Sequence, residues 1–96
     1  GRKPKIALLG LAFKPDIDDL RESPAVGIAQ DVIAKSQYEV LIVEPNIQQL
    51  PNKLAHNDAS LVELQLAIDE ADVVALLVKH SAFTNLENEK IISFVG

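Results

Sequence analysis

The chain has 96 residues, of which 48% are hydrophobic and 24% charged, and its formal net charge is −5. This length and composition are typical of one globular domain with a single modest core. The acidic balance argues against a nucleic-acid-binding surface, and the absence of cysteine excludes disulfides, thiolate metal sites and a cysteine nucleophile. No apolar run is long enough to span a membrane. We expect a cytoplasmic protein.

The first half of the chain predicts two strands and one helix. Residues 5–11 form a continuous apolar run, which is typical of a strand buried on both faces in a parallel sheet. A charged loop follows, and Ser23 and Pro24 then favour a helix start, with serine as N-cap and proline at the first helical position. We expect this helix over residues 24–35 and a second strand over residues 39–43.

The second half predicts one more helix and two more strands. After an irregular stretch with at most one short turn, Ser60 and Glu63 have the spacing of a capping box. A helix is therefore expected over residues 61–71. Residues 72–78 form the second strongly apolar run and predict another buried strand, and residues 91–95 predict the last one.

This alternation of strands and helices predicts an α/β fold for the single domain 1–96. The expected architecture is a three-layer, mostly parallel Rossmann-like sheet flanked by helices, with the strands at 5–11 and 72–78 next to or near each other. In such sheets ligands bind beyond the carboxyl ends of the strands. The charged loop after the first strand is therefore the first candidate site.

That loop holds two cations, Lys14 and Arg21, among four carboxylates. Two cations ahead of a helix N-terminus can hold a phosphate. They can also form weak surface ion pairs with the carboxylates, and the residues by themselves favour that second interpretation. Gly10, at the end of the first strand, would let the backbone approach a neighbour closely.

The amino-acid sequence of this loop is more informative than its charge. Gly-Leu-Ala-Phe-Lys at residues 10–14 and Asp-Asp-Leu-Arg-Glu-Ser-Pro at residues 18–24 resemble the signature of the C-terminal UDP-binding domain of the UDP-glucose/GDP-mannose dehydrogenase family. Further matches at residues 43–47, 70–72 and 77–83 extend the resemblance over essentially the whole domain. Within the family, Ile17 and residues 43–47 resemble UDP-N-acetylmannosamine 6-dehydrogenases.

The resemblance implies a fragment of a larger NAD-dependent UDP-sugar 6-dehydrogenase of polysaccharide biosynthesis. Such an enzyme would oxidise UDP-N-acetylmannosamine to UDP-N-acetylmannosaminuronate in two steps at C6. The NAD would be held mainly by an N-terminal domain, and a central helix would join subunits into a homodimer or higher oligomer. Because that enzyme's catalytic cysteine lies outside this chain, the fragment alone is expected to be inactive.

Site residues are carried over from the family one position at a time. Phe13 and Lys14 match positions that contact the UDP-sugar, and Arg21 matches an arginine that reaches the NAD phosphates. No residue is assigned a catalytic or metal-binding role. The family often has an Asp-Thr-(Lys or Arg)-Gly stretch after its last strand, whereas residues 91–96 carry no charge and receive no site.

Other patterns give weaker alternatives. The acidic residues of the loop lack the spacing of a calcium loop, so a solvated acidic loop is the preferred interpretation. A self-contained receiver-like or nucleotide-binding regulatory module is the alternative function, but Glu44 stands where a receiver has its aspartate. No G-x-G-x-x-G fingerprint for NAD is present. His80 is interpreted as a loop histidine, with Ser81 capping a short turn.

Overall fold

The computed structural model describes residues 3–12, 16 and 20–83, together with the backbone of residues 91–93. The strands form one five-stranded sheet in the order β3-β2-β1-β4-β5, and each neighbouring pair is parallel. The strand bounds are β1 Lys5–Leu9, β2 Glu39–Val43, β3 Ala59–Leu61, β4 Val73–Leu76 and β5 Ile91–Ser93. The expected parallel sheet, with the first strand beside the fourth, is confirmed.

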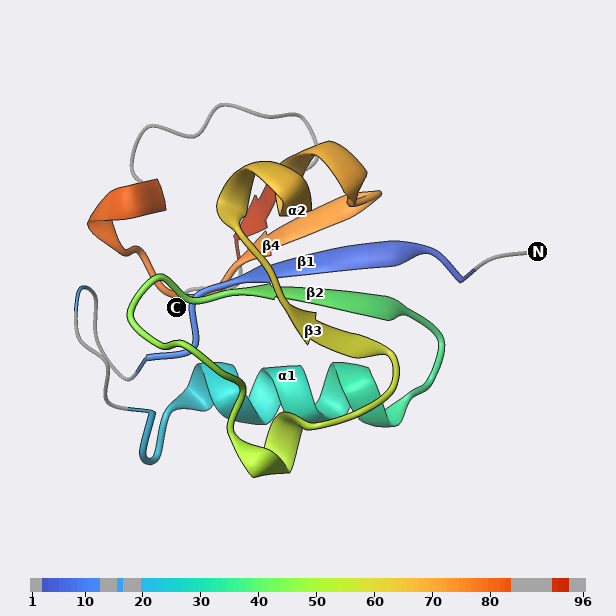
Figure 1. The fold of residues 1–96 in the computed structure, drawn as a ribbon, viewed down its shortest axis with the longest axis horizontal. Coiled ribbons are helices and arrows are strands. Elements are labelled where there is room, and N and C mark those ends of the chain that lie inside the picture. The colour runs from blue at the N-terminus through green and yellow to red at the C-terminus, as the bar shows by residue number, and fades with distance from the viewer. Residues whose placement is uncertain (1–2, 13–15, 17–19, 84–90, 94–96) are drawn as a thin grey trace.

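Two helices cover opposite faces of this sheet, α1 (Pro24–Ala34) and α2 (Leu64–Glu70), which completes the three layers (Figure 1). Two short 3₁₀ helices, η1 (Asn52–Leu54) and η2 (Ser81–Phe83), lie in the connections. Within the described residues, no helix is long and apolar enough to cross a membrane.

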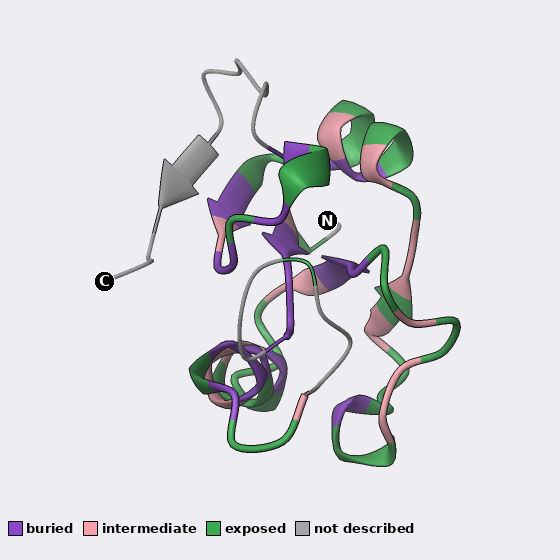
Figure 2. Cartoon of the chain, turned by 90° about the vertical axis from the view of Figure 1, so that its left-hand side faces the viewer, coloured by how far each residue is buried: buried purple, intermediate pink, exposed green. Residues whose placement is uncertain are grey.

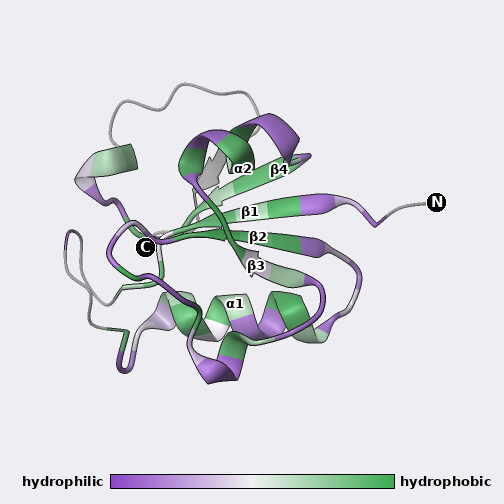
Figure 3. Ribbon diagram, viewed as in Figure 1, coloured by the Kyte–Doolittle hydropathy of each residue, from purple (hydrophilic) through white to green (hydrophobic). Residues whose placement is uncertain are grey.

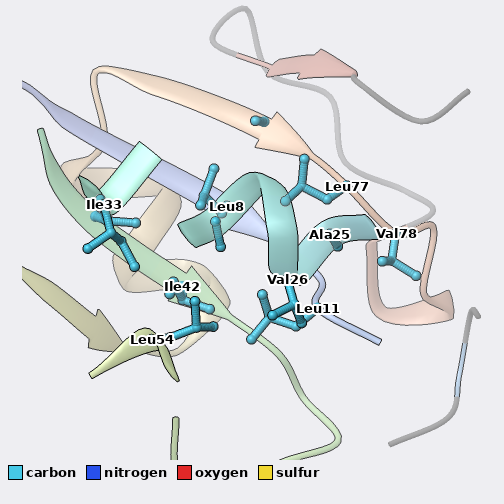
Figure 4. Packing of buried hydrophobic residues seen from close by; sticks show 12 residues of the cluster. Leu8, Leu11, Ala25, Val26, Ile33, Ile42, Leu54, Leu77 and Val78 are labelled. Carbon is cyan, nitrogen blue, oxygen red and sulfur yellow. The ribbon is translucent and has the colours of Figure 1, made fainter. Parts of the chain in front are cut away.

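The central strands are buried on both faces because each face packs against a helix layer. Leu8 and Ile42 point toward α1 and join Ala25, Val26 and Ile33 in one core cluster (Figure 4). The residues that alternate with them in the strands pack on the α2 side, namely Ala7, Leu9, Leu41 and Val43. This double burial explains the continuous apolar runs, and Figure 3 shows β1 and β2 as mainly hydrophobic after their first residues.

Several helices and strands are shorter than expected. The first strand ends at Leu9, because Gly10 has a φ of 98° and leaves the extended conformation. The strand expected at 72–78 covers Val73–Leu76, and α1 ends at Ala34 with Lys35 as its C-cap. Of the strand expected at 91–95, residues 91–93 are extended and the remaining two lie outside the described residues.

The second helix starts later than expected, because α2 begins at Leu64 and not at residue 61. Residues 59–61 form β3 on the outer edge of β2, with Ser60 opposite Leu41 in the register. Glu63 is the N-cap of α2 and makes no side-chain capping bond, so the capping box is wrong. Pairing with β2 satisfies backbone groups along this segment, including a Val62 N–H bond to the Ile42 carbonyl, whereas a side-chain cap satisfies one N–H.

Candidate functional site at the carboxyl edge of the sheet

The chain leaves β1 and β4 in opposite directions along the sheet, so these two strands form its topological switch point. The connection after β1 leads through α1 to β2, and the connection after β4 leads to β5 on the other side. Figure 2 looks toward this edge of the molecule. A switch point leaves a crevice beyond the strand ends in which sheets of this kind bind ligands.

Gly10 lets the strand ends approach each other closely at this point. Its N–H donates to the Val43 carbonyl over 2.8 Å, which joins the ends of β1 and β2. A Cβ at this position would lie 2.6 Å from the Val78 Cβ and 3.0 Å from the Val78 nitrogen. The expected close approach is confirmed, and the neighbour is the segment that follows β4.

Glu44, the first residue after β2, is a buried carboxylate whose oxygens are bonded to protein donors. Its Oε1 accepts hydrogen bonds from the Leu11 N–H at 2.8 Å and the Ala12 N–H at 3.1 Å. Its Oε2 accepts from the backbone N–H of Asn46 at 3.1 Å and from the Asn46 side-chain amide at 3.0 Å. A buried charge requires such donors, and here two of them come from the start of the β1–α1 loop.

His80 completes this arrangement from the end of the segment after β4. The residue is only 1% exposed, and its Nε2 lies 2.7 Å from Glu44 Oε1. Its Nδ1 accepts a 2.7 Å hydrogen bond from the Asp16 N–H, so the bonding network places a ring proton on Nε2. His80 lies in a loop as expected, but it is buried there, because the parallel strands bring it against the Glu44 carboxylate.

Asp16 reaches back from the β1–α1 loop to the same segment. Its carboxylate accepts from the Ser81 N–H at 2.7 Å and from the Ser81 hydroxyl at 2.6 Å, so Asp16 caps the first N–H of η2. Asp16 has a φ of 63°, a left-handed conformation that aspartate tolerates better than most residues. Glu44, His80 and Asp16 are called the edge cluster below.

The pKa values of both carboxylates in the edge cluster are lowered. Hydrogen bonds from the Ser81 side chain and backbone lower the pKa of Asp16. Burial raises the pKa of Glu44, but the hydrogen bonds from Leu11, His80 and Asn46 outweigh burial and bring it below its ordinary value. Both groups are therefore anionic at neutral pH, which suits their roles as acceptors.

Ser23 ties the other end of the loop to the same region. It occupies the N-cap position of α1, with Pro24 in the first turn as expected, but its hydroxyl makes no capping bond. The hydroxyl donates instead to the Ala12 carbonyl over 3.2 Å, in a position that is only 7% exposed. The β1–α1 loop is thus held at Ala12 by both Glu44 and Ser23.

The site residues expected from the sequence divide into two groups. Phe13 and Lys14 lie outside the described residues, but Ala12 on one side is bonded to the edge cluster and Asp16 on the other side belongs to it. Arg21 is described and lies in an exposed turn ahead of α1. The cluster itself was missed, and its signal was a carboxylate and a histidine that each follow a buried strand of one parallel sheet.

A pocket of about 430 Å³ opens beside Glu44, on the α2 side of the edge. Its walls are mostly apolar and come from the ends of β2 and β3, the start of α2, and η2; they include Val43, Leu61, Leu64 and Phe83. Its acidic lining residues are Glu44 and the exposed Glu63. An apolar pocket with carboxylates suits a ring or a sugar better than a diphosphate.

The Glu44 carboxylate is already bonded to protein donors at the position where a dinucleotide site would need it. Sheets that bind NAD commonly place a carboxylate after the second strand to accept the ribose hydroxyls. Glu44 has that position, but its oxygens already accept hydrogen bonds from Leu11, Ala12, Asn46 and His80. Among the residues with assigned structure, no group of three or more histidine or acidic side chains could hold a metal ion.

The sheet order, the switch point and the anchored β1–α1 loop define a doubly wound α/β domain of the nucleotide-binding kind. A family model described as "UDP-glucose/GDP-mannose dehydrogenase family, UDP binding domain" matches residues 7–95. The chain therefore belongs to the UDP-glucose/GDP-mannose dehydrogenase family. This membership disfavours the receiver-like alternative.

Curated relatives and a solved structure agree with this family. The chain is 55% identical over 92 residues to a UDP-N-acetyl-D-mannosamine dehydrogenase of Campylobacter jejuni, covering 95% of this chain and 23% of the relative. It is 51% identical to the enzyme of that name from Salmonella typhi, over 91% of this chain and 20% of the relative. A ternary complex of GDP-mannose dehydrogenase from Pseudomonas aeruginosa matches with a TM-score of 0.76 and 30% identity, over 100% of this chain and 26% of that one.

The chain thus spans about a fifth of the length of the curated relatives that it matches. A more distant relative, at 43% identity over 94 residues, is an NDP-N-acetyl-D-galactosaminuronic acid dehydrogenase of Ralstonia nicotianae, and the match covers 98% of this chain and 22% of that relative. The relatives are dehydrogenases much longer than this domain.

Proposed function

We propose that this chain is the C-terminal UDP-sugar-binding domain of an NAD-dependent UDP-sugar 6-dehydrogenase, and that it binds the nucleotide at the carboxyl edge of its sheet. The observation that carries the proposal is the anchored β1–α1 loop, at a switch point, in a chain that the family model matches over residues 7–95. A loop anchored by buried groups loses little conformational freedom when a ligand binds.

Within this proposal, Phe13 and Lys14 contact the UDP-sugar. Lys14 and Arg21 are the only cations between residues 10 and 24. In a chain with a net charge of −5, a diphosphate needs such locally placed cations. Arg21, exposed ahead of α1, reaches instead toward the NAD phosphates, where a guanidinium gives bidentate hydrogen bonds.

NAD itself is held mainly by an N-terminal domain of the same polypeptide, and the parent enzyme works as a homodimer or a higher oligomer in the cytoplasm. The support is that Glu44 is already bonded within this domain, and that the relatives are about five times as long as this chain. On this view the domain supplies one wall of a cleft, and the chemistry occurs on the other wall.

The substrate is proposed to be UDP-N-acetylmannosamine, which the parent enzyme oxidises at C6 in two steps to the uronate for polysaccharide biosynthesis. The support is that the relatives named for this activity are more similar, at 49–55% identity, than the galactosaminuronic acid enzyme at 43%. The measurement is NAD reduction by the full-length enzyme with UDP-N-acetylmannosamine, UDP-N-acetylgalactosamine and UDP-glucose in parallel. Faster turnover of either of the other two sugars would refute this choice.

The binding function is tested on the chain itself by titrating isotope-labelled protein and following its amide resonances. UDP should shift the amides of Leu11, Ala12 and Asp16, whereas NAD and inorganic phosphate at the same concentration should not. The affinity should fall as salt is added, because the contacts are ionic. Shifts of equal size with every anion, or shifts confined to the opposite edge of the sheet, would contradict the proposed site.

A further inference from the structure

Three segments that are distant in sequence meet at the edge cluster. The segment after β1 contributes Asp16, the segment after β2 contributes Glu44, and the segment after β4 contributes His80, which bonds to both of the others. Ser81, next to His80, bonds to the Asp16 carboxylate. The β1–α1 loop is consequently attached to β2 at Ala12 and to the end of β4 at Asp16.

The bonding of His80 indicates more than the satisfaction of a buried charge. Glu44 already accepts hydrogen bonds from Leu11, Ala12 and Asn46 without the histidine. What His80 adds is a second function on the other side of its ring, because Nδ1 accepts the backbone N–H of the exposed residue Asp16. The buried imidazole therefore connects a core carboxylate to an exposed point of the loop.

We propose that His80 is a positioning residue for nucleotide binding. Its Nε2–H holds it against Glu44, and its Nδ1 holds the Asp16 N–H, which fixes the second anchor of the β1–α1 loop relative to the strand ends. This inference rests on the proposed function, because the loop is the element through which the UDP-sugar is bound. It assigns no contact with the ligand to His80 itself.

The two ring nitrogens can be tested separately with two amide substitutions. In His80→Gln, the side-chain amide reaches the Nε2 position and can still donate to Glu44, but the acceptor for Asp16 is lost. In His80→Asn, the shorter amide places an acceptor at the Nδ1 position and leaves Glu44 without its histidine donor. Each variant is thus the matched control for the other.

The two variants are expected to differ in opposite ways, one in UDP affinity and the other in stability. His80→Gln should keep a melting temperature near that of the wild type and bind UDP about tenfold more weakly, as expected for loss of one hydrogen bond in the loop anchor. His80→Asn should lower the melting temperature but keep UDP affinity within about twofold, measured where the variant is folded. If the loss of affinity in both variants simply followed the loss of stability, His80 would be a core residue without a positioning role.

A second measurement needs no ligand and separates this inference from the proposed function. Hydrogen exchange of the Asp16 amide should be faster in His80→Gln than in His80→Asn and the wild type. If the wild type fails to bind UDP, the proposed function is wrong, while the exchange rates still decide whether His80 anchors the loop. Equal exchange rates in the three proteins would overturn the inference.

Asp16→Gly provides a route that leaves the core intact, should both histidine variants fail to fold. Glycine accepts the φ of 63° and keeps the N–H to His80, but removes both carboxylate bonds to Ser81. UDP affinity should fall in this variant and should fall less in Ser81→Ala, which loses one of the two bonds. Unchanged affinity in Asp16→Gly would contradict the idea that the loop anchor controls binding.

Discussion

Lys14 is the residue at which nucleotide binding can be tested most directly. In the proposed full-length dehydrogenase, Lys14→Ala should lower kcat/KM for the UDP-sugar by roughly ten- to a hundredfold, because a charge-assisted contact worth about 1.5–3 kcal/mol is lost. Lys35→Ala, an exposed lysine at the end of α1, is the matched control for charge. A value for Lys14→Ala within about twofold of the wild type would leave only a weak surface ion pair for this residue.

Arg21 is expected to act on the cofactor rather than on the sugar nucleotide. Arg21→Ala in the full-length enzyme should raise the KM for NAD more than the KM for the UDP-sugar, since the guanidinium is proposed to bond the cofactor phosphates. Steady-state kinetics with each substrate varied in turn makes the comparison. Equal effects on both substrates, together with a lower melting temperature, would indicate a structural ion pair instead.

Two glycines give opposite expectations for the same substitution. Gly10→Ala should destabilise the domain by about 2–5 kcal/mol, because alanine is strained at a φ of 98° and its Cβ would collide with Val78. Gly27→Ala in α1 meets no atom within 4 Å and should stabilise the domain by about 0.5–1 kcal/mol. Urea unfolding of both variants measures the difference, and similar stabilities for the two would contradict the close approach at Gly10.

At the scale of elements, two serines distinguish the observed secondary structure from the one expected from the sequence. Ser60 is exposed in β3, so Ser60→Ala should change stability by less than about 0.5 kcal/mol. If it capped a helix, the same substitution would cost about 0.5–2 kcal/mol. Ser23→Ala should lower the free energy of unfolding by about 1 kcal/mol, because the hydrogen bond to the Ala12 carbonyl is lost. This variant is the positive control, since it shows that the unfolding measurement resolves a change of that size.

The two ends of the sheet differ in how their ion pairs and hydrogen bonds are arranged. At the edge where the strands begin, the partly covered Lys5 pairs with the exposed Glu70 at 2.8 Å, and Lys3 pairs with Asp58 on the surface. At the carboxyl edge, Glu44 and His80 are buried and bond to backbone groups of the β1–α1 loop. Pairs of the first kind contribute little to stability, whereas bonds of the second kind determine local geometry.

For the whole molecule, the lowered pKa of Glu44 gives a defined dependence of stability on pH. A carboxyl whose pKa is lower when folded contributes stability above its unfolded pKa and loses that contribution as pH falls through the folded pKa. Asp16 contributes in the same direction. We therefore expect the free energy of unfolding to fall on acidification below the ordinary glutamate pKa of about 4.3.

Glu44→Gln tests this dependence. Its free energy of unfolding should be lower than that of the wild type at neutral pH, and the gap should narrow as the medium is acidified and the wild-type carboxylate becomes protonated. Glu63→Gln, at an exposed position in the same pocket wall, is the control and should run parallel to the wild type. A gap that stayed constant from neutral to acid pH would show that the charge of Glu44 does not contribute.

The sequence by itself determined the layered α/β fold, the parallel sheet and the family. The reason is that burial between two helix layers selects apolar residues along β1 and β2 after their first, charged residues, and the loop signature is local in the chain. The sequence could also name Phe13, Lys14 and Arg21 as site positions through the resemblance, although it could not test them.

The tertiary structure alone decided the start of α2 and the existence of the edge cluster. Ser60 had a local helix signal, but the outer edge of β2 offered backbone partners that a local pattern does not record. Glu44 and His80 are 36 residues apart, and each looked like an ordinary residue after a strand. They meet because parallel strands end at the same edge, so their pairing depends on strand order and register rather than on anything near them in the sequence.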